Sequence, residues 1–281
     1  MRSESFFPAK EPSLRICRSA LSMFRSRGAV AAWSLVFLST AAFAIEDRAD
    51  IEPNEPVGKD RGIAWKLTPS VYRETAGRSA IDLNLRGNRE SDTFWIGQYR
   101  RGAEFQQTRA GYEREFAVPM GRVIASGQYA TQGFWGGSIT LEASAAAIRP
   151  YVGLLGLGRT NRKPYYNLNF DPNDSVLIGA GWRPDEGTAL TLFQVRDDRL
   201  GTGQRVTHVV LRRKTGARSR WTVDLFKRAG RSDADPESQL FKSNGVTLTY
   251  DHEPWFVRFA WDPKVNYSNS DMTRMAIGMR F

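Results

Sequence analysis

The sequence has little of what stabilises or anchors many exported chains. It contains one cysteine, Cys17, among 281 residues, which excludes a disulfide framework. Only one apolar run approaches the length of a membrane-spanning helix, so a polytopic helical membrane protein is excluded. Hydrophobic residues make up 41% and charged residues 25% of the chain, a balance that fits neither a disordered nor a fibrous protein.

The N-terminal segment has the features of an export signal. Met23 could serve as the true start, Arg25 and Arg27 precede an apolar stretch, and Ala42 and Ala44 form an A-x-A-like cleavage site. We therefore predict that residues 1–44 are a cleaved signal peptide, with an inner-membrane anchor as the alternative. Residues 45–61 are acidic and proline-containing, and predict a flexible leader.

From residue 62 onward the dominant pattern is period two, which is typical of β-strands. In WFVRFAWD, apolar positions from Trp255 to Trp261 alternate with Arg258 and other positions of the opposite face. Fourteen such segments can be counted, and twelve is the alternative count if early segments are misread. Short links alternate with long ones in the C-terminal half, as periplasmic turns and outside loops do in membrane barrels.

Both a soluble sandwich and a membrane barrel alternate in this way, and the aromatic residues favour the barrel. They lie near strand ends, where aromatic girdles meet the bilayer interface. We assign these side chains to the apolar faces: Trp65, Trp95, Tyr99, Tyr129, Trp135, Trp182, Trp221, Tyr250, Trp255 and Trp261.

A signal segment, alternating strands and a final strand ending in phenylalanine resemble the outer-membrane β-barrel proteins of Gram-negative bacteria. The resemblance covers residues 62–281 and implies a single closed antiparallel transmembrane barrel of 12–14 strands, all-β in class, in the outer membrane. It also implies that apolar residues at every second position of the last strand are recognised by the barrel assembly machinery. The matching positions are Met275, Ile277, Met279 and Phe281.

The polar faces carry many arginines, and the net charge of the whole chain is +10. Fixed positive charges in a wet lumen lower the entry barrier for anions. The alternation predicts lumen-lining positions for Arg86, Arg100, Arg183, Arg228, Arg258, Arg274, Arg280, Asp82, Glu142, Asp224, Asp251 and Asp262. The alternative is that these arginines reflect composition, pair with the acidic residues, or meet lipopolysaccharide phosphates outside.

Enzyme activity is not expected from this sequence. Barrel lipid hydrolases, the rival class, use Ser and His, typically as H-x-S, whereas neither His208 nor His252 has a serine two residues on. Ser126, Ser138 and Ser144 have no identifiable base partner. The acidic loops lack the spacing of a calcium site, so no metal or cofactor is predicted.

We therefore expect a small passive, porin-like transport channel of the cell envelope for small, possibly anionic solutes. A non-conducting barrel for surface interaction or envelope integrity is the alternative within the fold. The expected partners are outer-membrane lipid and lipopolysaccharide, the assembly machinery and the solutes, and nucleic acid is not among them.

Overall fold

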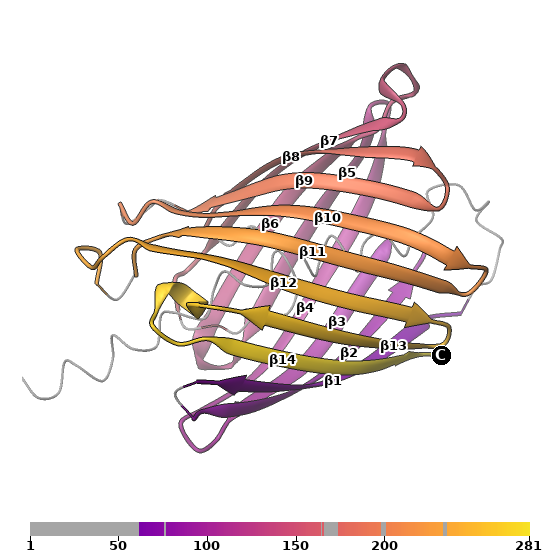
Figure 1. The fold of residues 1–281 in the computed structure, drawn as a ribbon. Helices are drawn as coiled ribbons and strands as arrows, with labels where there is room; N and C mark the ends of the chain where they lie inside the picture. Colours follow the sequence, from indigo (N-terminus) through magenta and orange to yellow (C-terminus); the bar gives the residue numbers. More distant parts are fainter. Residues whose placement is uncertain (1–61, 76, 164, 166–173, 198–200, 233–234) are drawn as a thin grey trace, which may run out of the picture. The chain divides into compact units, whose positions relative to one another are not determined.

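The computed structural model describes residues 62–281, except for 76, 164, 166–173, 198–200 and 233–234. Within these residues, fourteen antiparallel strands form one closed barrel (Figure 1). This strand number decides between the two predicted counts in favour of fourteen. The predicted signal peptide, residues 1–44, and leader, residues 45–61, lie outside the described residues.

The strands follow one another around the barrel in sequence order. They are β1 (Ala64–Glu74), β2 (Ser79–Arg89), β3 (Asp92–Arg101), β4 (Phe105–Val118), β5 (Gly121–Ala130), β6 (Phe134–Ala143), β7 (Tyr151–Thr160), β8 (Val176–Asp185), β9 (Thr188–Asp197), β10 (Gln204–Gly216), β11 (Ser219–Gly230), β12 (Phe241–His252), β13 (Trp255–Asp262) and β14 (Met272–Arg280). Single 3-10 turns lie at Thr131–Gly133, Ala146–Ile148 and Val265–Tyr267. No helix in the described part of the chain is both long and apolar enough to cross a membrane.

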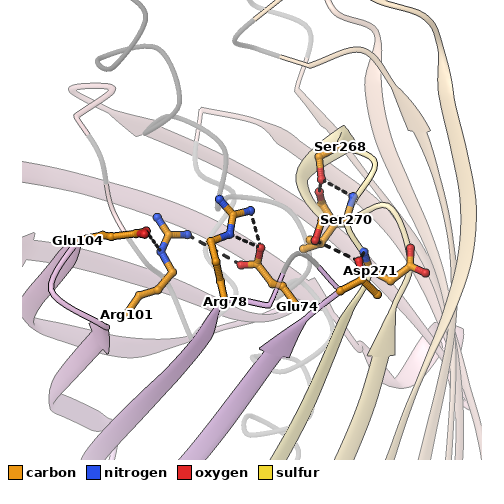
Figure 2. Close-up of polar contacts among 9 residues, drawn as sticks. Glu74, Arg78, Arg101, Glu104, Ser268, Ser270 and Asp271 are labelled. Carbon is orange, nitrogen blue, oxygen red and sulfur yellow. Dashed lines mark hydrogen bonds and ion pairs between the residues drawn. The ribbon is translucent and has the colours of Figure 1, made fainter.

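The barrel closes where β1 pairs with β14. At one end of this pair, the Trp65 amide donates to the Phe281 carbonyl at 2.8 Å, and the Phe281 amide returns a bond of 3.0 Å. At the other end, the Asp271 amide donates to Thr75 Oγ1 at 3.0 Å, close to Ser270 and the Glu74–Arg78 ion pair (Figure 2). Backbone groups at both ends of the closing pair are therefore satisfied, as a strand in hydrocarbon requires.

The connections differ between the two ends of the barrel. At the end where β14 terminates, the links are short, for example residues 186–187 and 217–218. At the opposite end they include residues 161–175, 231–240 and 263–271. We call these the turn end and the loop end. Outer-membrane barrels have short periplasmic turns and longer outside loops, so we expect the loop end to face outward from the cell.

The two faces of the sheet have opposite character. Large apolar side chains are exposed on alternate positions all around the barrel, for example Ile96, Leu155, Leu225 and Ile277, each between 50 and 54% exposed. The alternate positions between them carry buried polar and charged residues, such as Asp82 and Arg274. Because the sheet is closed, the exposed apolar face is the outer surface and the buried polar face is the inner one. This confirms the predicted lipid-facing barrel and excludes a soluble sandwich, whose apolar faces would be buried.

The aromatic prediction was wrong at two positions. Trp95 and Tyr99 are only 4% and 3% exposed and alternate with the outward-facing Ile96, so they point inward. Tyr99 packs against Tyr72 and Phe105 inside the barrel, with ring centroids 5.8 and 6.0 Å away. Inward aromatics fill the barrel interior near the strand ends. When both faces of a strand carry aromatic residues, the alternation in the sequence cannot distinguish such inward rings from an outward aromatic girdle.

The inward aromatics also require glycine on the neighbouring strand. Trp95 of β3 lies directly opposite Gly111 of β4, and a Cβ at Gly111 would lie 2.1 Å from Trp95 Cζ2. Phe256 of β13 covers Gly278 of β14 in the same way. A Cβ at Gly278 would lie 2.0 Å from Phe256 Cε1. These rings compensate for the missing side chain of a strand glycine.

Gly111→Ala should lower the free energy of unfolding by about 1–3 kcal/mol, because the buried Trp95 ring must leave its position. Gly127→Ala is the matched control, since a Cβ there meets nothing within 4 Å. Urea unfolding in detergent, followed by tryptophan fluorescence, measures both. Equal stabilities for the two variants would show that the ring accommodates the methyl group without cost.

Candidate functional site: the inner surface of the barrel

Eleven of the predicted lumen-lining residues occupy inward positions in the observed strands. Each falls on the buried alternate positions of its strand: Arg86, Arg183, Arg228, Arg258, Arg274, Arg280, Asp82, Glu142, Asp224, Asp251 and Asp262. These residues therefore lie on the inner surface of the barrel.

Arg100 is the exception, and its predicted inward position is wrong. It shares the outward face of β3 with Ile96 and is exposed, and its Nε donates to the Gly102 carbonyl at 3.2 Å. In the sequence, the Trp95 and Tyr99 rings indicated that their face was the lipid-facing one. Because these rings in fact fill the interior, the inward and outward faces of β3 are the reverse of the predicted ones.

The inner surface holds its charges in ion pairs between strands. Arg109 Nη2 on β4 donates to Asp82 Oδ1 on β2 at 2.6 Å, and both side chains are almost completely buried. Arg86 Nη2 lies 3.8 Å from Glu113 Oε1. These pairs skip the intervening strand β3, so they join side chains that project into the same interior space.

Two carboxylates near the turn end each contact two arginines. Glu142 on β6 accepts from Arg122 Nη2 at 2.9 Å and from Arg183 Nη2 at 3.0 Å. Arg122 also donates to Glu115 at 2.8 Å. A chain of charged groups therefore links β4, β5, β6 and β8, and its last contact, from Glu142 to Arg183, skips β7.

The second shared carboxylate is Asp251 on β12. It accepts from Arg280 Nη2 at 2.6 Å and from Arg220 Nη2 at 3.3 Å. The Phe256 ring lies beside this group, with Lys66 Nζ 4.6 Å and the Arg280 guanidinium 5.2 Å from its centroid. The Arg258 guanidinium lies 5.6 Å from the same centroid. We call Lys66, Arg220, Asp251, Phe256, Arg258 and Arg280 the Phe256 cluster, and its described charges are four cations and one carboxylate.

A sector of the inner surface is apolar, which the sequence prediction of a polar lumen did not anticipate. Leu177, Phe193, Val195 and Val210 form one buried cluster over β8, β9 and β10. His208 lies beside it, stacked on Phe193 with ring centroids 4.6 Å apart. The interior is therefore amphipathic, with an apolar sector on β8–β10 and charged groups on the strands around it.

His208 is held by a carboxylate. Its Nδ1 lies 3.0 Å from both oxygens of Asp224 on β11, and both side chains are buried. Its Nε2 has no hydrogen-bond partner among the described residues. Among the described residues, no serine hydroxyl contacts this ring.

The second histidine, His252, contacts a serine, whereas His208 contacts a carboxylate. Its Nδ1 lies 2.9 Å from Ser219 Oγ, directly across the β11–β12 pair at the exposed turn end. No carboxylate bonds to this ring within the described part of the chain. A nucleophile and a base are present, but the third group that would orient the base is missing. Ser126 and Ser138 bond to each other at 2.8 Å.

One long connection contributes to the interior. Tyr165, between β7 and β8, stacks on the inward Phe134 ring at 3.7 Å and donates its hydroxyl to Gln128. Sequence patterns gave no signal for this contact, because the segment around Tyr165 has no strand periodicity. Arg109 and Glu113 were detectable in principle, since they alternate with the outward-facing Tyr112 and Phe116.

Metal chemistry has no evident support in the described residues, since no group of three or more metal-ligating side chains occurs there. Parts of the acidic loops fall outside the described ranges.

Comparison with known proteins gives structural neighbours only. No family model matches the sequence, and no curated protein matches it. Omp33 of Acinetobacter baumannii, an outer-membrane protein, is 7% identical with a TM-score of 0.48, covering 78% of this chain and 98% of that one. The NanC porin is 6% identical with a TM-score of 0.43, covering 76% and 100%. A variant of the Rh. blastica porin is 9% identical with a TM-score of 0.43, covering 78% and 99%.

At these identities the class is defined by the geometry itself. A closed strand order, an apolar outer surface and a charged inner surface satisfy what a bilayer demands of a spanning sheet. The chain is a closed fourteen-stranded β-barrel with the apolar outer surface of a membrane-spanning barrel.

Proposed function

We propose that the barrel is a passive channel for small solutes and that it prefers anions. The observation that carries the proposal is the Phe256 cluster. Three inward cations from β1, β13 and β14 lie around the Phe256 ring, and a fourth, from β11, shares the one described carboxylate, Asp251, with Arg280. Fixed cations that face a wet, low-dielectric passage offset part of the hydration that an anion loses on entry. The same charges oppose the entry of cations.

Planar bilayer conductance in a salt gradient tests the proposal. The wild-type barrel should conduct, with a reversal potential that indicates anion preference. Arg258→Gln with Arg280→Gln should lower the anion-to-cation permeability ratio by about twofold or more. Asp251 keeps its contact with Arg220 in this variant, so the carboxylate is not stranded.

Arg100→Gln is the matched control, because it removes one arginine from the outer surface. It should leave the permeability ratio unchanged. Cation preference in the wild type, or equal effects of the inward and outward variants, would contradict an anion-selecting inner surface.

A non-conducting barrel is the second candidate, and a specific observation favours it. The inward side chains of Gln107, His208 and Arg228 are 0% exposed, and Tyr165 packs inside from a connection. A barrel used for envelope integrity would show no single-channel current while remaining folded. No observation supports a lipid hydrolase, since within the described residues neither His208 nor His252 lies in a complete set of catalytic groups.

The route to the membrane is part of the same proposal. Met275, Ile277 and Phe281 are exposed on the outer surface of the last strand and its end, where an assembly factor could read them together with Met279. This exposure supports their role as the recognition signal for the assembly machinery. Export by cleavage after Ala44 stays a prediction, which N-terminal sequencing of the membrane-fraction protein would check.

A further inference from the structure

The outer surface over β9–β12 changes character in three steps toward the loop end. The first row across these strands is apolar and consists of Leu192, Val209, Leu225 and Val246. The next row consists of Gln194, Thr207, Lys227 and Asn244, with Gln194 Nε2 donating to Thr207 Oγ1 at 2.8 Å. The last row contains Arg196, Arg205, Ala229 and Lys242.

This sequence of rows follows the profile of a bilayer from hydrocarbon to head groups. The apolar row matches the acyl chains, and the two polar rows lie where head groups begin. Because the rows end at the loop end, the polar rows belong to the outer leaflet. We call Arg196, Arg205, Lys227 and Lys242 the loop-end cationic patch.

The patch places like charges side by side. Arg196 and Arg205 are directly opposite each other in the β9–β10 register, and all four side chains are exposed. Like charges at directly opposed positions destabilise a sheet. Within the described residues, no carboxylate lies at ion-pair distance from any of the four, and Arg196 bonds only to the neutral Gln194. No carboxylate in the described part of the chain therefore neutralises the patch.

Outward-facing arginines near the turn end show a different arrangement. Arg114 Nε lies 3.7 Å from Asp92, and Arg213 Nη1 lies 3.8 Å from Asp185. Each of these cations has a carboxylate of the chain beside it. The missing counter-charge is thus a property of the loop-end patch and not of every outward arginine.

We propose that the loop-end cationic patch binds the phosphates of lipopolysaccharide in the outer leaflet. Guanidinium groups bind phosphate through two parallel hydrogen bonds, and clustered Lys and Arg side chains at a bilayer surface attract anionic head groups. A phosphorylated glycolipid would supply the missing anions at the level of the patch while its acyl chains cover the apolar row below. This binding is independent of conduction through the lumen.

The test uses the full barrel in phosphatidylcholine nanodiscs, with bound lipid counted by native mass spectrometry. The probes are bisphosphorylated lipid A, lipid A without phosphates, and phosphatidylglycerol. The wild type should bind bisphosphorylated lipid A about tenfold or more tightly than either other probe. Arg196→Gln, Arg205→Gln, Lys227→Gln and Lys242→Gln combined should abolish this preference.

The matched control combines Arg114→Gln and Arg213→Gln, and it should keep the wild-type preference. Heat-modifiable gel mobility reports whether each variant is folded. If the variant with all four substitutions fails to fold, Arg205→Gln alone replaces it and should lose part of the preference for bisphosphorylated lipid A. A wild type that does not distinguish the phosphorylated lipid would overturn the proposal. Equal binding of phosphatidylglycerol, or an unchanged preference in the patch variants, would do the same.

Discussion

Asp262→Ala should lower the free energy of unfolding by about 3–5 kcal/mol, because it leaves a buried guanidinium without its anion. Arg228 on β11 is 0% exposed. Its Nη1 and Nη2 donate to the two Asp262 oxygens at 2.7 and 3.1 Å, and Nη1 also lies 3.3 Å from the Lys264 carbonyl. The Phe226 and Tyr267 rings, each 5.6 Å from the guanidinium, complete its surroundings.

A double variant identifies the cause of this loss. Arg228→Met with Asp262→Ala removes both charges, so it should cost less than Asp262→Ala alone. Arg213→Gln is the control for an exposed pair, and its cost should stay below about 1 kcal/mol. Urea unfolding of all variants in the same detergent gives the comparison. If the double variant were as unstable as Asp262→Ala, lost packing and not a stranded charge would explain the effect.

The architecture was predictable because it depends on a repeated local property. A strand whose alternate residues are apolar must place them on one side, and fourteen such segments with short links to neighbours can close into a barrel. Most inward positions, such as Asp82 and Arg274, followed from the same alternation. The aromatic Trp135 and Trp261 also lie on the outer surface, at 60% and 45% exposure.

Alternation failed where both faces of a strand are apolar in part. On β3 the rings of Trp95 and Tyr99 outweigh Ile96, so the sequence suggests the wrong outer face, and Arg100 was misplaced with it. The same ambiguity hides the apolar inner sector, because Phe193 and Val195 on β9 alternate with Leu192 and Leu190, which are apolar too. On such strands, contacts with the neighbouring strands, such as Trp95 over Gly111, decide which face points inward.

Partners between distant strands could not be predicted at all. The Arg109–Asp82 and Arg183–Glu142 pairs each skip a strand, and the choice between several acceptable carboxylates depends on how far each strand is staggered around the barrel. The bond from Arg228 to the Lys264 carbonyl depends on the fold of the β13–β14 connection. The Ser219–His252 contact likewise needs the β11–β12 register, since no spacing within one segment encodes it.

Ile96→Arg should lower the free energy of unfolding in lipid by about 2–4 kcal/mol, because it places a charge on the outer surface within the apolar band. Ile96 is 54% exposed, and its register neighbours on β2 and β4 are Leu85 and Ala110. In a soluble protein an exposed isoleucine tolerates arginine with little cost. The size of the loss therefore reports directly on whether this surface meets hydrocarbon.

Gln98→Arg is the matched control on the same strand and face, two residues nearer the loop end. It should cost at most about 1 kcal/mol, because the penalty for arginine falls toward the bilayer interface. Reversible urea unfolding in liposomes measures both variants, and the same pair in detergent should differ less, since a micelle deforms around a charge more easily than a bilayer. A small loss for Ile96→Arg in liposomes would mean that the outer surface of β3 is not covered by acyl chains. The exposed apolar face would then need a protein partner to cover it.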